Sequence, residues 1–136
     1  MSMEAVRALM KEAGWGDLAT TDGERAFSRP MGGWAWVGKE LWCATGADSD
    51  KVAQLKKRPH AEYCFITRDG RHVRISGPCA VSADQADKDK LYELVPQLKE
   101  HIDDVKSPQY VVLRMQPQHI RLMTTEDMQY TEVALE

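Results

Sequence analysis

Two Asp-Gly pairs, Asp22-Gly23 and Asp69-Gly70, constrain this chain most strongly, because each separates two segments of alternating apolar and polar residues. Alternation with a period of two is typical of half-buried strands, and Asp-Gly favours the tight turn of a β-hairpin. The segments 18–30 and 61–82 are therefore predicted to form hairpins. Consecutive hairpins in turn predict an antiparallel sheet.

Other segments repeat the strand pattern. The stretch 32–46 is predicted to contain two strands joined by a turn at Gly38-Lys39, and Pro117 separates two more predicted strands at 110–116 and 119–123. The total is six to eight short strands. Closing them into a small antiparallel barrel removes exposed sheet edges, which favours a barrel over a sandwich.

Apolar residues at helical spacing predict short helices between the strands, over 3–13, 49–58 and 84–102. Ser49 is a suitable N-cap for the second helix, and Pro96 should kink the third or divide it in two. The fold class is therefore mainly β (α+β), with short flanking helices. The last eight or so residues are polar, and we expect them to be poorly ordered until they meet a partner.

The charge balance excludes some classes of partner. The chain has 18 Lys+Arg and 21 Asp+Glu, so its net charge is −3. It therefore has no general positive field to hold nucleic acid or an anionic membrane. A small anionic ligand remains compatible with this balance. No apolar run reaches the roughly 18 residues of a membrane helix, and charges occupy the first 14 residues, where a signal peptide would be apolar. We expect one cytoplasmic domain spanning residues 1–136.

The cysteines and histidines show no metal-ligand spacing. Cys43, Cys64 and Cys79 are odd in number and lie in apolar or small-residue stretches, which favours reduced thiols over a disulfide framework. The four histidines do not form a motif of the HxxxH kind. No metal site is predicted.

A loop before the second helix could bind a phosphate group. Thr45 and Ser49 supply hydroxyl groups, Lys51 supplies an ammonium group, and the helix N-terminus adds free backbone N–H groups. Arg29 would add a planar guanidinium if its strand lies alongside. The same residue types also fit a plain helix cap, a strand position and two surface charges. The residues alone leave both interpretations open.

A larger set of motifs bears on this choice, in the stretches "LATTDGERAFSRPM", "KELWCATGADSDKVAQLKKRPHAEYCF" and "HVRISGPCAVS". They contain a strand Arg-Pro, a Thr at a strand end, and Ser-x-Lys opening a helix that finishes in a basic residue and Pro. In this order, over nearly the whole chain, they resemble the FMN-binding split-barrel family related to pyridoxamine 5′-phosphate oxidase. The continuation through residues 83–102 is most similar to the subgroup that includes the nitroimidazole-resistance proteins.

The resemblance implies a small antiparallel split β-barrel with FMN as cofactor. It implies that Arg29, Ser49 and Lys51 hold the FMN phosphate and that Thr45 lies at the ribityl-phosphate end. By the same resemblance Pro30 and Met31 run beside the isoalloxazine ring, and His72 and Arg74 approach the flavin or the substrate pocket. An exposed hairpin residue is the alternative for His72.

Two departures from the family pattern limit what can be transferred. Asp50 stands where the family's oxidases have a second basic residue, and its carboxylate would weaken a phosphate site unless it points away or bonds to the helix N-terminus. The C-terminal region also lacks the Trp- and Arg-containing motif that binds pyridoxamine phosphate. We therefore expect that the chain is not a true pyridoxamine 5′-phosphate oxidase.

Three tryptophans, Trp34, Trp36 and Trp42, form a predicted cluster on adjacent strands. Core or dimer packing explains such a cluster, and Trp34 walling the flavin site is the alternative. Family members are homodimers with FMN at the subunit interface. The resemblance therefore implies a homodimer whose formation is a condition for cofactor binding.

No acid/base pair or activated nucleophile stands out in the sequence. We therefore expect an FMN-dependent oxidoreductase that moves electrons between NADH or NADPH and a small organic acceptor, with no dedicated catalytic side chain. Two alternatives remain. One is a non-catalytic carrier or sensor of flavin or haem, and the other is an interaction domain with an empty cleft.

Overall fold

The computed structural model describes residues 2–135, which form nine antiparallel strands, three α-helices and one 3₁₀ helix. The strands are β1 (Gly16–Thr21), β2 (Ala26–Met31), β3 (Trp34–Val37), β4 (Glu40–Gly46), β5 (His60–Ile66), β6 (His72–Ser82), β7 (Tyr110–Met115), β8 (His119–Met123) and β9 (Tyr130–Glu132). The helices are α1 (Met3–Ala13), α2 (Asp50–Lys57), α3 (Gln85–Leu94) and the 3₁₀ helix η1 (Pro96–Glu100).

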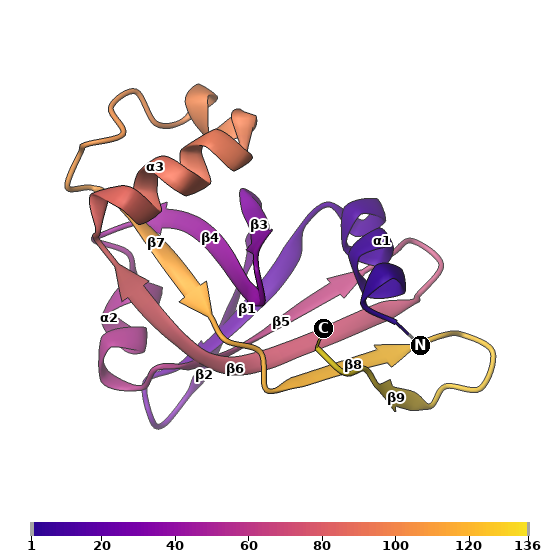
Figure 1. Ribbon diagram of the computed structural model, residues 1–136. Coiled ribbons are helices and arrows are strands. Elements are labelled where there is room, and N and C mark those ends of the chain that lie inside the picture. The colour runs from indigo at the N-terminus through magenta and orange to yellow at the C-terminus, as the bar shows by residue number, and fades with distance from the viewer. Residues whose placement is uncertain (1, 136) are drawn as a thin grey trace.

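The strands form one curled sheet in the order β2-β1-β5-β6-β7-β4-β3, with β8 and β9 added beside β6 (Figure 1). The long strand β6 joins the two halves of the sheet. Its first half, from His72 to Ser76, pairs with β8, and its second half, from Cys79 to Ser82, pairs with β7. This is the predicted split barrel of mainly β (α+β) class.

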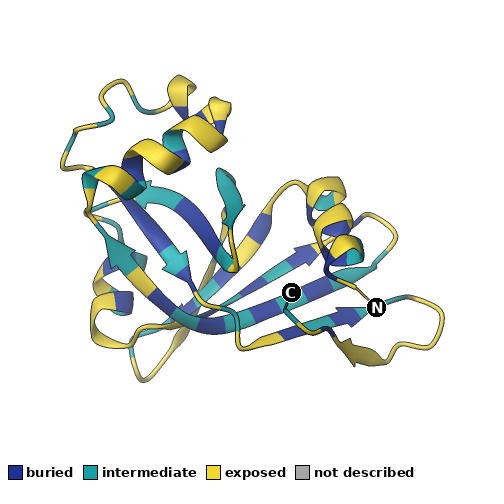
Figure 2. Ribbon diagram, in the orientation of Figure 1, coloured by how far each residue is buried: buried dark blue, intermediate teal, exposed yellow. Residues whose placement is uncertain are grey.

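The two faces of the β2-β1-β5-β6 layer differ in character. One face, called the core face here, is mainly apolar, with Leu18 opposite Tyr63 and Tyr63 opposite Ile75, all fully buried. The other face, called the outer face, carries Asp17 opposite Cys64 and then Cys64 opposite Arg74. Figure 2 shows the same alternation of buried and less buried positions along β5 and β6.

Each helix covers a different part of the sheet. Helix α1 contacts β5 and β6 through Val6, Leu9 and Met10, while α2 contacts β1 and β6 through Val52 and Leu55. Helix α3 lies across β4 and β7 (Figure 1), where a second apolar cluster forms around Leu91, Leu98, Trp42 and Val112. No helix among residues 2–135 is long and apolar enough to cross a membrane.

The division of the third helix at Pro96 is confirmed, because α3 ends at Leu94 and η1 begins at Pro96. The expectation of a poorly ordered C-terminus is wrong for the described residues. Tyr130–Glu132 pairs with β8, and the buried Val133 donates its N–H to the Ile120 carbonyl at 2.8 Å. A short strand with exposed side chains has a weak sequence signal, since its stability comes from its neighbour.

The three tryptophans do not form one cluster, so that prediction is also wrong. Trp34 pairs with Cys43 and Trp36 pairs with Leu41, which places these two indoles on the core side. Trp42 pairs with Ala35 and points to the opposite side, into the apolar cluster beneath α3. Successive residues of a strand face opposite ways, and this decides which of the indoles can meet.

Candidate cofactor site

Arg29 projects from β2 on the core face, opposite Leu18 of β1. Its Nη1 donates to Thr20 Oγ1 at 2.7 Å and to the Leu18 carbonyl at 3.3 Å. Thr20 in turn donates to the side-chain oxygen of Gln54 on α2. Burial lowers the pKa of the Arg29 guanidinium, and the nearby charge of Asp50 partly opposes that shift. Both of these hydrogen bonds use Nη1 of Arg29, so the other N–H donors of its guanidinium are open to a ligand.

Lys51 reaches the same region from the first turn of α2. Its Nζ donates to Thr45 Oγ1, at the end of β4, at 2.9 Å. Burial lowers the pKa of the Lys51 ammonium, and the positive charge of Arg29 lowers it further. None of the ion pairs within residues 2–135 includes either cation. Two neighbouring cations without carboxylate partners create a local positive potential that favours an anion.

Ser49 occupies the N-cap position of α2, as predicted, but its hydroxyl does not cap the helix. Its Oγ donates to the Gly46 carbonyl at 2.8 Å. The first backbone N–H groups of α2 therefore have no side-chain acceptor, and the positive end of the helix stays available to an external anion. Asp50 is exposed in this first turn, where its charge reduces the positive potential.

The structure thus brings Arg29, Thr45, Ser49 and Lys51 to one place, and we call these four residues the cradle. Beside it opens a pocket of about 1030 Å³, which starts at Thr45 and Gly46. One wall is the glycine pair Gly32-Gly33 with the indole of Trp34, and the other is the segment from 97 to 110. The cradle and the pocket therefore share Thr45.

The glycine pair makes this wall close-fitting. A Cβ on Gly32 would lie 3.1 Å from the Trp15 ring, and Gly33 has a φ of +67°. Trp34 is fixed by an Nε1 bond to the Gly14 carbonyl at 2.9 Å and by an edge-on contact with Phe65. The alternative in which Trp34 walls the site therefore matches its position.

Pro30 and Met31 are not among the residues that line this pocket. Met31 is buried in the main apolar core, whereas Pro30 pairs with Asp17 and faces the outer side. The pocket is lined instead by the next two residues along the chain, Gly32 and Gly33. Two consecutive glycines in the sequence indicate a place where another group can approach the backbone closely.

His72 and Arg74 lie on the outer face, away from the cradle of the same chain. His72 has Tyr130 Oη 2.8 Å from its Nε2, and Arg74 forms an ion pair with Glu62 at 3.0 Å. The guanidinium of Arg74 also lies over the Tyr130 ring, 5.5 Å from its centre. The β6 register pairs these two residues with Ile66 and Cys64, which excludes them from the face that carries Arg29.

Sequence reasoning missed the segment that forms the far wall of the pocket, between η1 and β7. Leu98, Ile102 and Tyr110 give this wall an apolar surface, and His101 adds an imidazole. The spacing of Leu98 and Ile102 indicated only a helix face. Among the described residues, no group of three or more His, Cys, Asp or Glu is placed to hold a metal ion.

Comparison with known proteins identifies relatives of this architecture. A family model described as pyridoxamine 5′-phosphate oxidase like matches residues 1–133. A NimC/NimA family protein from Clostridium acetobutylicum superposes with a TM-score of 0.83 at 22% identity, over 96% of this chain and 89% of that one. No curated protein matches the chain significantly.

Two further solved structures share the fold. A pyridoxamine 5′-phosphate oxidase-related, FMN-binding protein from Nostoc punctiforme has a TM-score of 0.68 at 15% identity, over 98% of this chain and 95% of that one. A haem-binding protein from Mycobacterium smegmatis has a TM-score of 0.75 at 16% identity, over 95% of this chain and 57% of that one. At such identities the likeness concerns the fold.

Proposed function

Because the chain belongs to the pyridoxamine 5′-phosphate oxidase-like family, we propose that it is an FMN-binding oxidoreductase that passes electrons from NADH or NADPH to a small organic acceptor. The observation that carries this proposal is the pair Arg29 and Lys51. Both cations lack a carboxylate partner and lie near the open N-terminus of α2. Structural neighbours of this chain include an FMN-binding protein and an F420 reductase.

The residues of the site fit FMN at both of its ends. The cradle offers charged and hydroxyl donors to a phosphate monoester, and such charge-assisted hydrogen bonds are the strong ones. The pocket beside Thr45 offers Trp34, Leu98 and Tyr110 to a flat ring, on a backbone wall of two glycines. Its volume of about 1030 Å³ suits a cofactor with space left for a second ligand.

The chain itself supplies binding and orientation. FMN held by the cradle and the pocket would supply two-electron redox chemistry, by which the acceptor gains a hydride equivalent from the nicotinamide and one proton from solvent. Cys43, near Lys51, is not a nucleophile, because complete burial raises the pKa of its thiol to about 12. The three free cysteines are consistent with a cytoplasmic location, where thiols stay reduced.

A homodimer is part of this proposal. His72 and Arg74 lie on the outer face and so cannot act on the cradle of their own chain. In a two-fold dimer that sets the outer face of each chain beside the cradle of its partner, each chain would present these two side chains to the flavin of the other chain. This arrangement would give both residues the role that the family resemblance implies.

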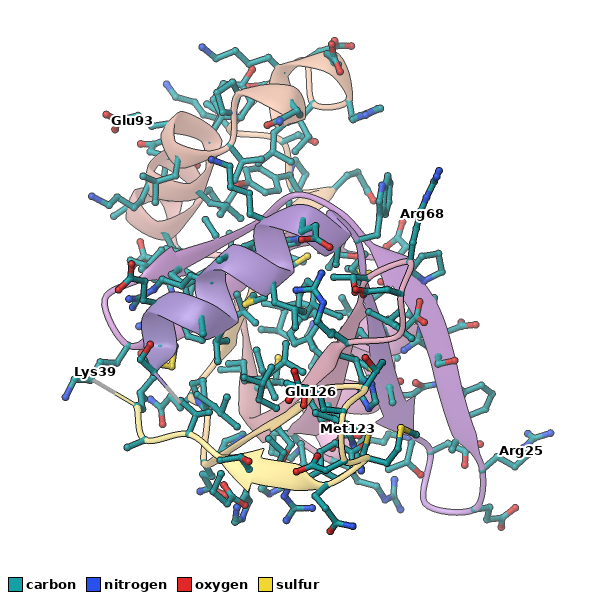
Figure 3. The ribbon with its side chains drawn as sticks, turned by 90° about the vertical axis from the view of Figure 1, so that its right-hand side faces the viewer. Arg25, Lys39, Arg68, Glu93, Met123 and Glu126 are labelled. Atoms are coloured by element: carbon teal, nitrogen blue, oxygen red, sulfur yellow. The ribbon has the colours of Figure 1, made fainter. Side chains whose placement is uncertain are left out.

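The test is a titration of the purified protein with FMN, followed by absorbance and equilibrium dialysis. We expect one FMN per chain, and we expect Arg29→Ala to weaken binding. Arg25→Ala is the matched control, because Arg25 extends into solvent at the tip of the β1–β2 turn (Figure 3). Oxidation of NADH or NADPH in the presence of quinones and nitro compounds then tests turnover. Absence of FMN binding would refute the proposal.

A non-catalytic carrier of flavin or haem is the second candidate. It is favoured by His101, which lines the pocket, because an imidazole is a common axial ligand of haem iron. The structural likeness to a haem-binding protein points the same way. Tight FMN binding without turnover of any acceptor would identify a flavin carrier. A Soret band that His101→Ala abolishes would identify a haem carrier.

A further inference from the structure

The pocket beside the cradle carries negative charge on its far wall. Glu100, Asp103 and Asp104 line the pocket, and we call these three residues the acidic rim. Their side chains are exposed, and none of the ion pairs in residues 2–135 involves them. The only cationic residue among those that line the pocket is Lys11, with His101 as a further titratable group. The carboxylates therefore outnumber the cations in this pocket.

The acidic rim is held in place by helix α3. Gln85 Nε2 donates to the Val105 carbonyl at 3.1 Å. Two further bonds fix the same segment, from Lys88 Nζ to the Ser107 carbonyl at 2.8 Å and from Tyr92 Oη to the Ile102 carbonyl at 3.1 Å. Lys88 is only 3% exposed and its ammonium group lies over the Tyr110 ring. It therefore does not reach the carboxylates of the acidic rim. The three carboxylates of the acidic rim thus lie on a segment that hydrogen bonds from α3 hold in place.

The two ends of the site therefore have opposite signs. Arg29 and Lys51 make the cradle positive, while the rim makes the far wall of the pocket negative. Between them lies an apolar lining formed by Trp34, Leu98 and Ile102, which suits a flat ring. Charges around a partly closed cleft raise the local concentration of ligands of opposite sign and repel those of like sign.

We infer that the acceptor admitted to this pocket is a small aromatic ring compound that is cationic or uncharged, and that the acidic rim disfavours small ring acceptors whose own ring substituents are anionic. This inference names the substrate class of the site and rests on the proposed function. It distinguishes the second ligand from FMN, whose phosphate belongs at the positive end. Phosphorylated or carboxylated rings are poor acceptors on this basis.

Three pyridine rings of similar size and different charge test the inference. The FMN-loaded protein is titrated at low ionic strength with 1-methylnicotinamide, nicotinamide and nicotinate, and binding is measured by equilibrium dialysis. We expect the cation to bind about fivefold more tightly than the anion, or better, with the neutral ring between them. Added salt should reduce this ratio.

The double variant Asp103→Asn/Asp104→Asn should bring the ratio close to one. The control Glu24→Gln/Glu126→Gln removes the same charge from the β1–β2 and β8–β9 turns and should leave the ratio unchanged. Equal or tighter binding of nicotinate, no saturable binding of 1-methylnicotinamide, or an equal loss of preference in both double variants would overturn the inference. The separate FMN titration of wild-type protein shows whether the proposed function has failed instead.

Discussion

Burial lowers the pKa of the Lys51 ammonium, and the like charge of Arg29 lowers it further, so the proximity of the two cations is unfavourable in the protein without an anion. Folding tolerates this because each cation has a hydroxyl partner, Thr20 for Arg29 and Thr45 for Lys51. An anionic phosphate group would relieve the repulsion. A pair of this kind is typical of a binding site that is incomplete without its ligand.

Replacing Lys51 should affect FMN affinity and the free energy of unfolding differently. Lys51→Ala should weaken FMN binding by about 1.5–3 kcal/mol, the contribution of a charge-assisted hydrogen bond to the phosphate. The free energy of unfolding of the FMN-free protein should change little, because relief of the burial of the ammonium and of its repulsion from Arg29 offsets the lost hydrogen bond to Thr45. Isothermal titration calorimetry and urea denaturation measure the two quantities.

Lys39→Ala is the matched control for this variant. Lys39 lies at the β3–β4 turn and extends into solvent (Figure 3), so its loss should change neither quantity. FMN affinity that is equal in both variants would show that Lys51 does not face the phosphate group.

The sequence predicted the residue types of the cradle but not their orientation. Ser49 was identified as an N-cap, yet its hydroxyl donates to the Gly46 carbonyl. Which partner a hydroxyl selects depends on the fold of the preceding loop. The face occupied by His72 followed from alternation along its strand, whereas the position of that face relative to Arg29 required the register of four strands.

At the scale of elements, Gly77 lies where β6 passes from one half of the sheet to the other. A Cβ at this position would lie 2.1 Å from the Gln116 carbonyl oxygen, which is backbone and cannot move aside easily. The segment after β7 is fixed there, because Gln116 and Gln118 donate their N–H groups to Pro78 and Ser76. The bend of the sheet therefore requires a residue without a side chain at position 77.

Gly77→Ala should lower the free energy of unfolding by about 3 kcal/mol, at the upper end of the usual cost of overpacking. The reason is that the connection between β7 and β8 must shift and lose backbone hydrogen bonds. Chemical denaturation measures the change. The neighbouring Ser76→Ala is the control and should cost less than about 0.5 kcal/mol. Equal stability of the two variants would contradict the assigned contact.

Arg114 joins three elements on the other half of the sheet. It donates to both carboxylate oxygens of Glu40 at 2.9 and 3.2 Å and to Asp87 at 3.0 Å, and it lies 4.8 Å from the Trp42 ring centre. The hydrogen bond from Arg114 is the main cause of a lowered pKa for the Glu40 carboxyl group. Strands β4 and β7 and helix α3 are thus linked through one guanidinium.

This link predicts a pH dependence of stability. Glu40→Gln should lower the free energy of unfolding by about 1–2 kcal/mol at neutral pH. The pKa of the Glu40 carboxyl group is lower in the folded state than its ordinary value of 4.5, so its contribution is complete above pH 4.5 and is lost as the pH falls through the lowered pKa.

The difference between wild type and variant should therefore shrink in acid, as measured by urea denaturation at several pH values. Glu93→Gln is the control, since Glu93 extends from α3 into solvent (Figure 3) and should show no such difference. A difference that stays constant through the acid range would mean that the Glu40 charge is not what Arg114 stabilises.

Element prediction succeeded where a local signal was strong. Both Asp-Gly hairpins were confirmed, as β1–β2 and β5–β6, because the turn and its alternating flanks act within a few residues. Strand β9 was missed, since its exposed residues Tyr130–Glu132 gain their pairing from β8. The prediction of a tryptophan cluster was wrong for a related reason, because it was made from neighbouring strands without knowledge of their register.

At the scale of the whole molecule, the residues expected at the cofactor site lie on the two faces of one sheet. The cradle opens on the core face, whereas His72 and Arg74 lie on the outer face. That outer face also carries Ile66, which is 54% exposed although it is apolar. Tyr130, which is 40% exposed, lies beside His72 on the same face, so the homodimer proposed above would remove two exposed side chains from water. A second copy of the chain would cover this face and would bring His72 and Arg74 to another cradle.

Ile66→Glu should therefore dissociate the proposed homodimer and weaken FMN binding together. Size-exclusion chromatography with light scattering should show a fall from twice the 15.4 kDa of one chain to that mass, and FMN affinity should drop about tenfold or more. The control is Leu94→Glu, since Leu94 is also apolar and 44% exposed but lies at the end of α3. FMN affinity that survives in a monomeric Ile66→Glu protein would place the whole cofactor site within one chain, and the outer face would then have no part in it.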